Sequence, residues 1–226
     1  MANVGHQKKY ESSKSRILHA AAKLFLRQGY QSTTVAEIAR EAGADRNAIF
    51  YIFGDKETLL SELVAYVLEG QFEATKGLVA DKTEDPILFY AAGTTLQLYM
   101  AESSEHIREM YAVSYSLTKP SDVIYHTITG KLEKIFGAHL PHLETKDFFE
   151  LEIASGGIMR SFMTVPCDMY FTMDRKVRRF LETTFLVYRV SDEKIDEAVQ
   201  FVSQFDYPAI AQHTVDHMLN YLESKT

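Results

Sequence analysis

Residues 33–60, TTVAEIAREAGADRNAIFYIFGDKETLL, decide the fold of this chain. Thr34 and Glu37 have the S/T-x-x-E spacing of a capping box, in which each side chain binds a backbone N–H group at the start of a helix. Apolar residues then fall on one helix face, at positions 35, 38, 39 and 42. Gly43 follows, and glycine can end a helix in the left-handed conformation without a steric penalty. The stretch therefore predicts a short helix that stops at Gly43.

A second short helix is predicted directly after this turn. Asp45 is a suitable N-cap, and Ile49 and Phe53 are four residues apart, which places them on a common inward face. Two short helices around a glycine turn are typical of the helix-turn-helix, a DNA-binding motif whose second helix enters the major groove.

Motifs around these helices resemble the TetR family of bacterial transcriptional regulators. The resemblance is carried by residues 50–57, FYIFGDKE, followed by Leu59 and Leu60, and by residues 16–25, RILHAAAKLF, followed by Gly29, Tyr30 and residues 33–35. It covers about residues 13–60. It implies a three-helix DNA-binding head in a homodimeric regulator, usually a repressor, that a small ligand releases from DNA.

Charge is divided unevenly along the chain. Residues 1–56 contain nine Lys and Arg against five Asp and Glu, or +4, and the rest contains 15 against 26, or −11, which together give −7. A basic head on an acidic body suits a phosphate-binding module joined to one that does not bind phosphates.

Composition indicates an ordered globular protein. At 226 residues with 46% hydrophobic residues, the chain can form one or two well-packed domains. The single cysteine, Cys167, excludes an internal disulfide and suits a reducing compartment. No apolar stretch approaches the length of a membrane span, and residues 1–15 are too polar for a signal peptide, so we expect a cytoplasmic protein without membrane contact.

Helical spacing without sustained alternation predicts an all-α fold of about eleven helices. We expect a DNA-binding domain over residues 1–56, with a mobile arm over 1–12 that offers Lys8 and Lys9 to phosphates, and a helical ligand-binding and dimerisation domain over 57–226. A long helix from Asp55 towards Val79 joins the two. The further predicted helices span residues 87–102, 106–117, 122–136, 146–164, 169–190, 193–205 and 209–223.

The resemblance places the DNA contacts in and beside the second short helix. Base-reading positions fall on Arg46, Asn47, Ala48 and Tyr51, and phosphate-contact positions on Thr33, Thr34, Phe50 and Lys56. Arg46 can pair with a guanine edge and Asn47 with an adenine edge. Phe50 departs from the family, which commonly has Tyr there, so a hydroxyl–phosphate bond is lost. The expected target is a palindromic operator in double-stranded DNA, read by two heads on a two-fold axis.

The helices of the body are rich in aromatic residues and methionine. Most of these side chains fill a helical core, but such residues also line ligand pockets in helical bundles. We expect a cavity for a small apolar or aromatic effector, lined by Tyr99, Met110, Tyr111, Tyr115, Ile128, Met159 and Phe162. The pair Gly156-Gly157 inside a helix is costly and indicates either close helix packing or a kink beside a cavity.

Dimerisation is expected through late helices, as the resemblance implies. We favour residues 146–190 over the terminal pair 193–205 and 209–223, because the former are longer and more apolar. The expected interface residues are Ala154, Gly157, Phe180, Leu181, Phe185 and Tyr188.

No catalytic, cofactor or metal site is expected. His213 and His217 lie one helical turn apart, but the glutamate that follows the first histidine in zinc proteases is replaced by Thr214 and a third ligand is missing. The sequence therefore predicts a ligand-responsive transcriptional regulator that is not an enzyme. The alternative is a helical small-molecule-binding protein or enzyme without DNA binding.

Overall fold

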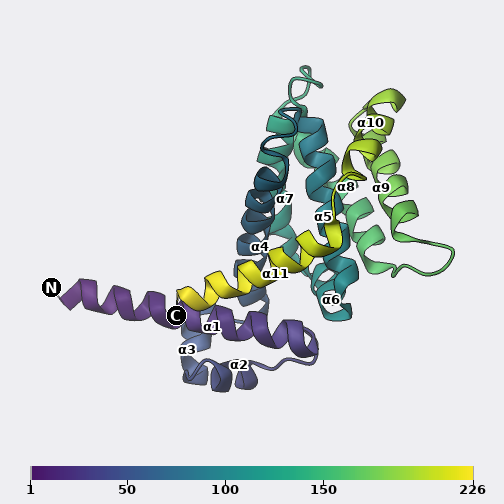
Figure 1. Ribbon diagram of the computed structural model, residues 1–226. Coiled ribbons are helices and arrows are strands. Elements are labelled where there is room, and N and C mark those ends of the chain that lie inside the picture. Colours follow the sequence, from purple (N-terminus) through teal and green to yellow (C-terminus); the bar gives the residue numbers. More distant parts are fainter. Residues whose placement is uncertain (1, 226) are drawn as a thin grey trace.

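The computed structural model describes residues 2–225, with side chains from residue 10 onward, and these residues form eleven α-helices and no strand (Figure 1). The helices are α1 (Ala2–Gln28), α2 (Val35–Glu41), α3 (Arg46–Phe53), α4 (Lys56–Val79), α5 (Pro86–Ser103), α6 (Glu105–Ser114), α7 (Thr118–Phe136), α8 (Thr145–Thr164), α9 (Met173–Val187), α10 (Asp192–Val202) and α11 (Tyr207–Ser224). The all-α prediction is confirmed. None of the helices in this part of the chain has the length and apolar character needed to cross a membrane.

Helices α1–α3 form a small head below the body and share a core with the first turns of α4. The capping box at the start of α2 is present, because Glu37 Oε2 accepts from the Thr34 N–H at 2.8 Å and Thr34 Oγ1 accepts from the Glu37 N–H at 3.2 Å. Gly43 has a φ of 57°, so the predicted left-handed turn is confirmed. The core side chains of the head include Ile17, Phe25, Ile38, Ile49, Phe53 and Leu59, all buried.

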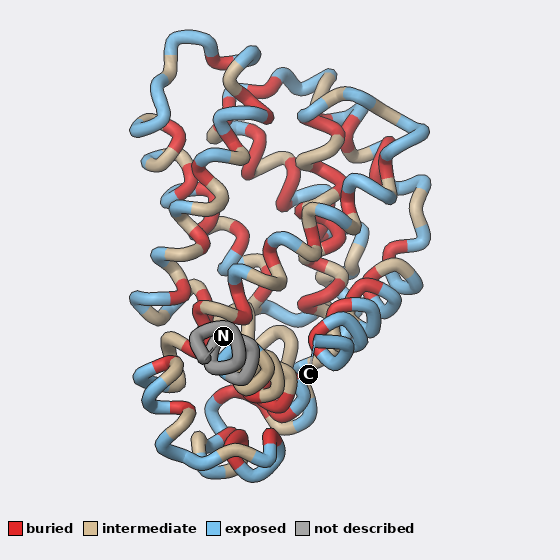
Figure 2. Tube along the Cα trace, turned by 90° about the vertical axis from the view of Figure 1, so that its left-hand side faces the viewer, coloured by how far each residue is buried: buried red, intermediate tan, exposed pale blue. Residues whose placement is uncertain are grey.

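Helix α5 is the centre of the body. It is buried nearly all round, which matches its apolar sequence, since a helix without a polar face must be covered on every side. Helices α4, α7, α8, α9, α10 and α11 contact it, and α11 runs diagonally from α5 to α1 (Figure 1). Figure 2 shows the buried positions along the inward faces of these helices.

Three predicted segments begin elsewhere in the structure. The backbone of α1 is helical from Ala2, where an arm separate from the first helix was predicted, and the side chains of Lys8 and Lys9 lie outside the described residues. Helix α7 starts at Thr118, before the predicted 122, because Pro120 is tolerated in a first turn. Helix α9 starts at Met173 rather than 169.

The late start of α9 has a local cause. Asp168 Oδ1 accepts hydrogen bonds from the N–H groups of Tyr170 at 2.8 Å and Phe171 at 2.7 Å. An aspartate that binds the backbone two or three residues ahead stabilises a turn at the expense of a helix. Residues 165–172 therefore remain a loop between α8 and α9.

The left-handed conformation of Gly43 predicts that substitutions there lower stability. A Cβ built at Gly43 meets no atom within 4 Å, so the cost of substitution there comes from the backbone conformation alone. We expect Gly43→Ala to lower the free energy of unfolding by about 1–2 kcal/mol in chemical denaturation. Gly43→Asn should cost less, because asparagine visits the left-handed region more readily. Equal losses in the two variants would contradict this explanation.

Candidate DNA-binding and effector sites

Helix α3 is fixed by a cap at its N-terminus and by apolar side chains on its inner face. Asp45 Oδ1 caps it by accepting from the Asn47 N–H at 2.7 Å, and Ile49 and Phe53 anchor it in the core of the head. The opposite face carries the predicted base-reading residues. Arg46 and Asn47 are exposed, Ala48 is half-buried, and Tyr51 is 83% exposed. This face can therefore enter a groove without rearrangement of the head.

The predicted phosphate-contact residues do not all lie on that face. Thr34 and Phe50 are exposed, and the Arg46 guanidinium lies 5.6 Å from the centroid of the Phe50 ring. Thr33 is buried and its hydroxyl donates to the Gly29 carbonyl at 2.6 Å, so its side chain is not available for the predicted phosphate contact.

Lys56, a predicted phosphate contact, is bound within the head. Its ammonium group donates to the carbonyls of Tyr30 and Thr33, both at 2.9 Å, and lies 4.0 Å from the centroid of the Tyr30 ring. Lys56 therefore joins the start of α4 to the connector between α1 and α2. The sequence shows only that a lysine stands at the family's phosphate-contact position. In the folded chain its ammonium group is hydrogen-bonded to backbone carbonyls of the connector.

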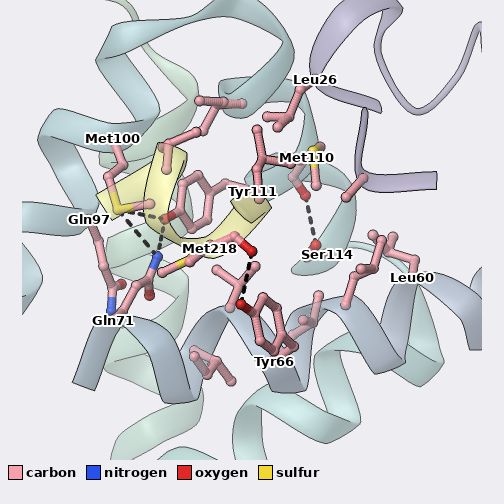
Figure 3. Close-up of a pocket in the computed structure, with 18 of the residues that line it drawn as sticks. Leu26, Leu60, Tyr66, Gln71, Gln97, Met100, Met110, Tyr111, Ser114 and Met218 are labelled. Atoms are coloured by element: carbon pink, nitrogen blue, oxygen red, sulfur yellow. Dashed lines mark hydrogen bonds between the residues drawn. The ribbon is translucent and has the colours of Figure 1, made fainter. Parts of the chain in front are cut away.

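An apolar cavity of about 100 Å³ lies where the body meets the head (Figure 3). Its walls come from α1, α4, α5, α6, α7 and α11. Gln71 donates through Nε2 to the Tyr111 hydroxyl, and the Tyr66 hydroxyl donates to the Met218 carbonyl at 2.9 Å. The rest of the lining is largely aliphatic side chains and methionines, including Leu26, Leu60, Leu63, Met100, Met110 and Leu222.

A second cavity of about 60 Å³ lies further from the head, between α4, α5, α7 and α8. It contains Glu152, which is 4% exposed and accepts from the Ser155 hydroxyl at 3.0 Å. Ser155 in turn accepts from the Tyr188 hydroxyl at 2.7 Å. Burial raises the pKa of the Glu152 carboxyl to about 8, because the charged form loses its hydration there, and the Ser155 hydrogen bond opposes this only in part.

The predicted pocket residues do not line a single cavity. Met110, Tyr111 and Tyr115 line the apolar cavity, and Ile128 and Met159 line the second cavity together with Tyr115. Two other predictions are wrong for these cavities. Tyr99 stacks on Tyr207 with ring centroids 5.2 Å apart and borders a separate groove beside α9 and α10, and Phe162 packs against Phe171 and Phe180.

Sequence reasoning missed two walls and the buried acid. Helix α11 contributes Val215, Met218, Leu219 and Leu222, whose spacing of three and four residues is a visible apolar stripe. Helix α4 contributes Gln71, which lines both cavities. Glu152 carries no local signal, because only the packing of other helices over α8 removes it from water.

The comparisons with known proteins agree with this geometry. Residues 17–63 match the family model for bacterial regulatory proteins of the tetR family. The N-terminal domain is a TetR-family helix-turn-helix. A curated relative, the HTH-type transcriptional regulator HbdR of Aromatoleum sp. (strain CIB), is 42% identical over 59 residues, which cover 26% of this chain and 26% of that relative. The chain thus matches about a quarter of the length of HbdR.

Solved structures extend the likeness in fold to the body of this chain. RolR in complex with resorcinol has a TM-score of 0.66 at 16% identity and covers 88% of this chain and 97% of its own. SmeT, the repressor of the Stenotrophomonas maltophilia multidrug efflux pump SmeDEF, has a TM-score of 0.54 at 20% identity. The match covers 80% of this chain and 94% of SmeT. These likenesses show a shared fold.

The predicted interface residues are divided between the exposed face of α8 and the buried face of α9. Ala154 and Gly157 are exposed. Four others, Phe180, Leu181, Phe185 and Tyr188, are fully buried in the core of the same chain, so their predicted contact with a second copy is wrong. The apolar stripe of α9 is needed to pack α9 on its own body, as Phe136 stacked 4.1 Å from Tyr188 illustrates.

Other residues form the outward surface of these two helices. Leu186 is 65% exposed and Ile153 is 48% exposed. The hydrogen bond between Tyr188 and Ser155 brings the end of α9 beside the middle of α8. We call the surface made by Ile153, Ala154, Gly157, Ser161, Arg179 and Leu186 the α8–α9 outer face.

The buried Glu152 predicts a pH dependence of stability. Its native pKa of about 8 exceeds the unfolded value of 4.5, so the native state binds more protons than the unfolded chain between these pH values. The free energy of unfolding therefore falls as pH rises through that window, by at most about 1.4 kcal/mol per unit. Glu152→Gln removes this titration, so its stability relative to the native sequence should increase from pH 5 to 8 and level off above 8 in thermal melts. A constant difference would contradict the assignment.

Proposed function

We propose that this protein is a ligand-responsive transcriptional regulator, acting as a repressor, that binds a palindromic operator as a homodimer. The observation that carries the proposal is the exposed outer face of α3 on a TetR-family head, next to an effector cavity in the body. TetR-family regulators bind DNA and small molecules, typically as dimers. A single helix reads only a few base pairs, so two heads on a two-fold axis are needed for specificity.

The position of the apolar cavity supports release by a ligand. Ala22 and Leu26 of α1 belong to its wall, so the cavity directly borders the DNA-binding head. On the neighbouring α6, Met110 and Tyr111 face the cavity while Glu109 Oε1 accepts from the Gln31 N–H of the connector at 2.8 Å. A ligand that displaces α6 therefore moves the connector, and a ligand that prefers the wrong head spacing lowers DNA affinity by linkage.

Two structural relatives support an aromatic effector. RolR was solved with resorcinol and SmeT with triclosan. In this chain the apolar cavity offers Tyr66, Tyr111, Met110 and Met218 as a flat and adaptable lining, with the Gln71–Tyr111 pair as its polar group.

Selection of binding sites from random duplex DNA tests the proposal. The selected sequences should form an inverted repeat with half-sites about one helical turn apart or a multiple of it, and affinity should fall steeply with salt. Arg46→Ala should cost about 1–3 kcal/mol on the selected site and relax its base preference, because Arg46 reaches a base edge. Lys146→Ala, which removes an exposed cation at the start of α8, is the charge control.

The contrary outcomes are distinct. Equal losses on selected and random DNA for Arg46→Ala would remove its base-reading role. Failure to enrich any sequence, with weak binding that does not respond to salt, would favour the helical binder or enzyme that lacks DNA binding.

The proposed dimer uses the α8–α9 outer face. Leu186→Glu should produce monomers in sedimentation and weaken operator binding at least tenfold, because a two-fold axis places the two introduced carboxylates near each other. Its thermal stability should remain close to normal, since Leu186 is exposed. Tyr221→Glu on α11 is the matched variant for the alternative terminal interface. An intact dimer for Leu186→Glu together with dissociation for Tyr221→Glu would move the interface to α11.

A further inference from the structure

Glu152 is a buried acid without a cationic partner. Among the described residues no cation pairs with it, and its carboxyl group accepts a side-chain hydrogen bond from Ser155. Lys131 lines the same cavity but its ammonium group is engaged with Glu69 at 3.4 Å and with the Phe72 ring, whose centroid is 4.0 Å away. A carboxyl group buried in this way costs stability, so the cavity around it calls for an explanation.

Gly156 keeps the space beside Glu152 open. A Cβ at this position would lie 3.1 Å from Glu152 Oε1, 3.4 Å from a ring carbon of Tyr115 and 3.5 Å from one of Tyr125. Any larger residue would therefore occupy the gap between the carboxyl group and the two rings. Gly156, in the middle of α8, therefore lies in the wall of the second cavity.

Gln71, in the wall of the same cavity, has an unsatisfied acceptor. Its side chain is 2% exposed and lines both cavities, and its Nε2 donates a hydrogen bond to the Tyr111 hydroxyl. Gln71 Oε1 is buried and has no hydrogen-bond partner among the described residues. Buried acceptors in native proteins are almost always paired, so this unpaired oxygen on a residue of the cavity wall adds a negative partial charge that favours a cationic ligand.

Aromatic rings complete the surroundings of the carboxyl group. The titratable groups facing Glu152 from the neighbouring helices are tyrosines, namely Tyr90 of α5, Tyr115 at the end of α6, Tyr125 of α7 and Tyr188 at the end of α9. Burial raises the pKa values of Tyr90, Tyr115 and Tyr188, so these three stay neutral over the physiological range. A carboxylate among tyrosine rings is the surrounding that organic cations prefer.

We propose that the cavity around Glu152 binds the cationic head of an effector, a quaternary or protonated amine, whose apolar part occupies the larger cavity. The two cavities share the wall residues Leu68, Gln71, Gln97 and Tyr115, so an apolar group attached to the head reaches the larger cavity past Gln71. The inference rests on the proposed function, because it names the class of ligand that the regulator senses.

Binding of such a cation is coupled to a proton. Glu152 holds a proton at neutral pH in the empty cavity, since its pKa is about 8, and must release it to pair with the cation. Below pH 8 the affinity for a permanent cation therefore rises about tenfold per pH unit, and above pH 8 it becomes constant.

Two probes of the same shape isolate the charge. Phenyltrimethylammonium carries a permanent positive charge, and tert-butylbenzene replaces its nitrogen by carbon. We would measure the affinity of each for the full chain without DNA, by ligand-observed NMR between pH 6 and 9. The cation should bind at least tenfold more tightly at pH 8 and show the predicted pH profile, whereas the affinity of the neutral probe should not depend on pH.

Two variants test the site itself. Glu152→Gln keeps the shape of the side chain, so it should lower the affinity for the cation at pH 8 at least tenfold, abolish the pH profile and leave the neutral probe unaffected. Gly156→Ala should lower the affinity for the cation severalfold, because the added methyl group fills the gap beside the carboxyl group. Gly130→Ala is the matched control, because a Cβ at that helical glycine meets no atom within 4 Å.

Equal affinities for the two probes, or an unchanged affinity and pH profile for the cation in Glu152→Gln, would overturn the inference. These results are independent of DNA. If the protein binds a selected operator but does not prefer the cationic probe over the neutral one, only the proposed ligand class is wrong. If the cation binds as expected but no DNA is selected, the proposed function fails and the binding site remains.

Discussion

The continuity of α4 is the constraint on which the rest of the structure depends. The helix begins at Lys56 in the head, where Asp55 caps it by accepting from the Thr58 N–H at 2.7 Å, and it ends at Val79 in the body. Its 24 residues span about 36 Å without a flexible linker. Leu60 and Leu63 contact the apolar cavity and Gln71 contacts both cavities, so the head and the cavity walls share one rigid element.

Head and body also meet through apolar packing of α1 against α6 and α11, and through partly exposed polar contacts. Lys119 at the start of α7 pairs with Asp55 at 2.6 Å, and its N–H donates to Glu57 at 2.8 Å. The hydrogen bond from Lys119 lowers the pKa of Asp55 to about 2, so this carboxyl group is ionised at neutral pH. Exposed ion pairs of this kind contribute little net stability. The apolar packing therefore contributes more to the stability of the junction than this ion pair does.

The cavities contain the features that lower the stability of the fold. A neutralised Glu152 and an orphaned acceptor on Gln71 are both buried between helices that are otherwise packed by apolar side chains. Conflicts between local chemistry and core packing are expected at functional sites, where stability is exchanged for binding. In this chain both conflicts lie in the walls of the same cavity, on α4 and α8.

The sequence alone determined the elements whose causes are local. The capping box of Thr34 and Glu37, the left-handed Gly43 and the periodicity of the body helices act within a few residues, so the head and the all-α class followed from the pattern. Tertiary structure decided what depends on distant partners. The stripe of α9 was visible, but only packing shows that Phe185 faces its own core while Leu186 faces outward. The burial of Thr33, the capture of Lys56 by two carbonyls and the desolvation of Glu152 likewise arise from chain segments far away in sequence, and no local pattern encodes them.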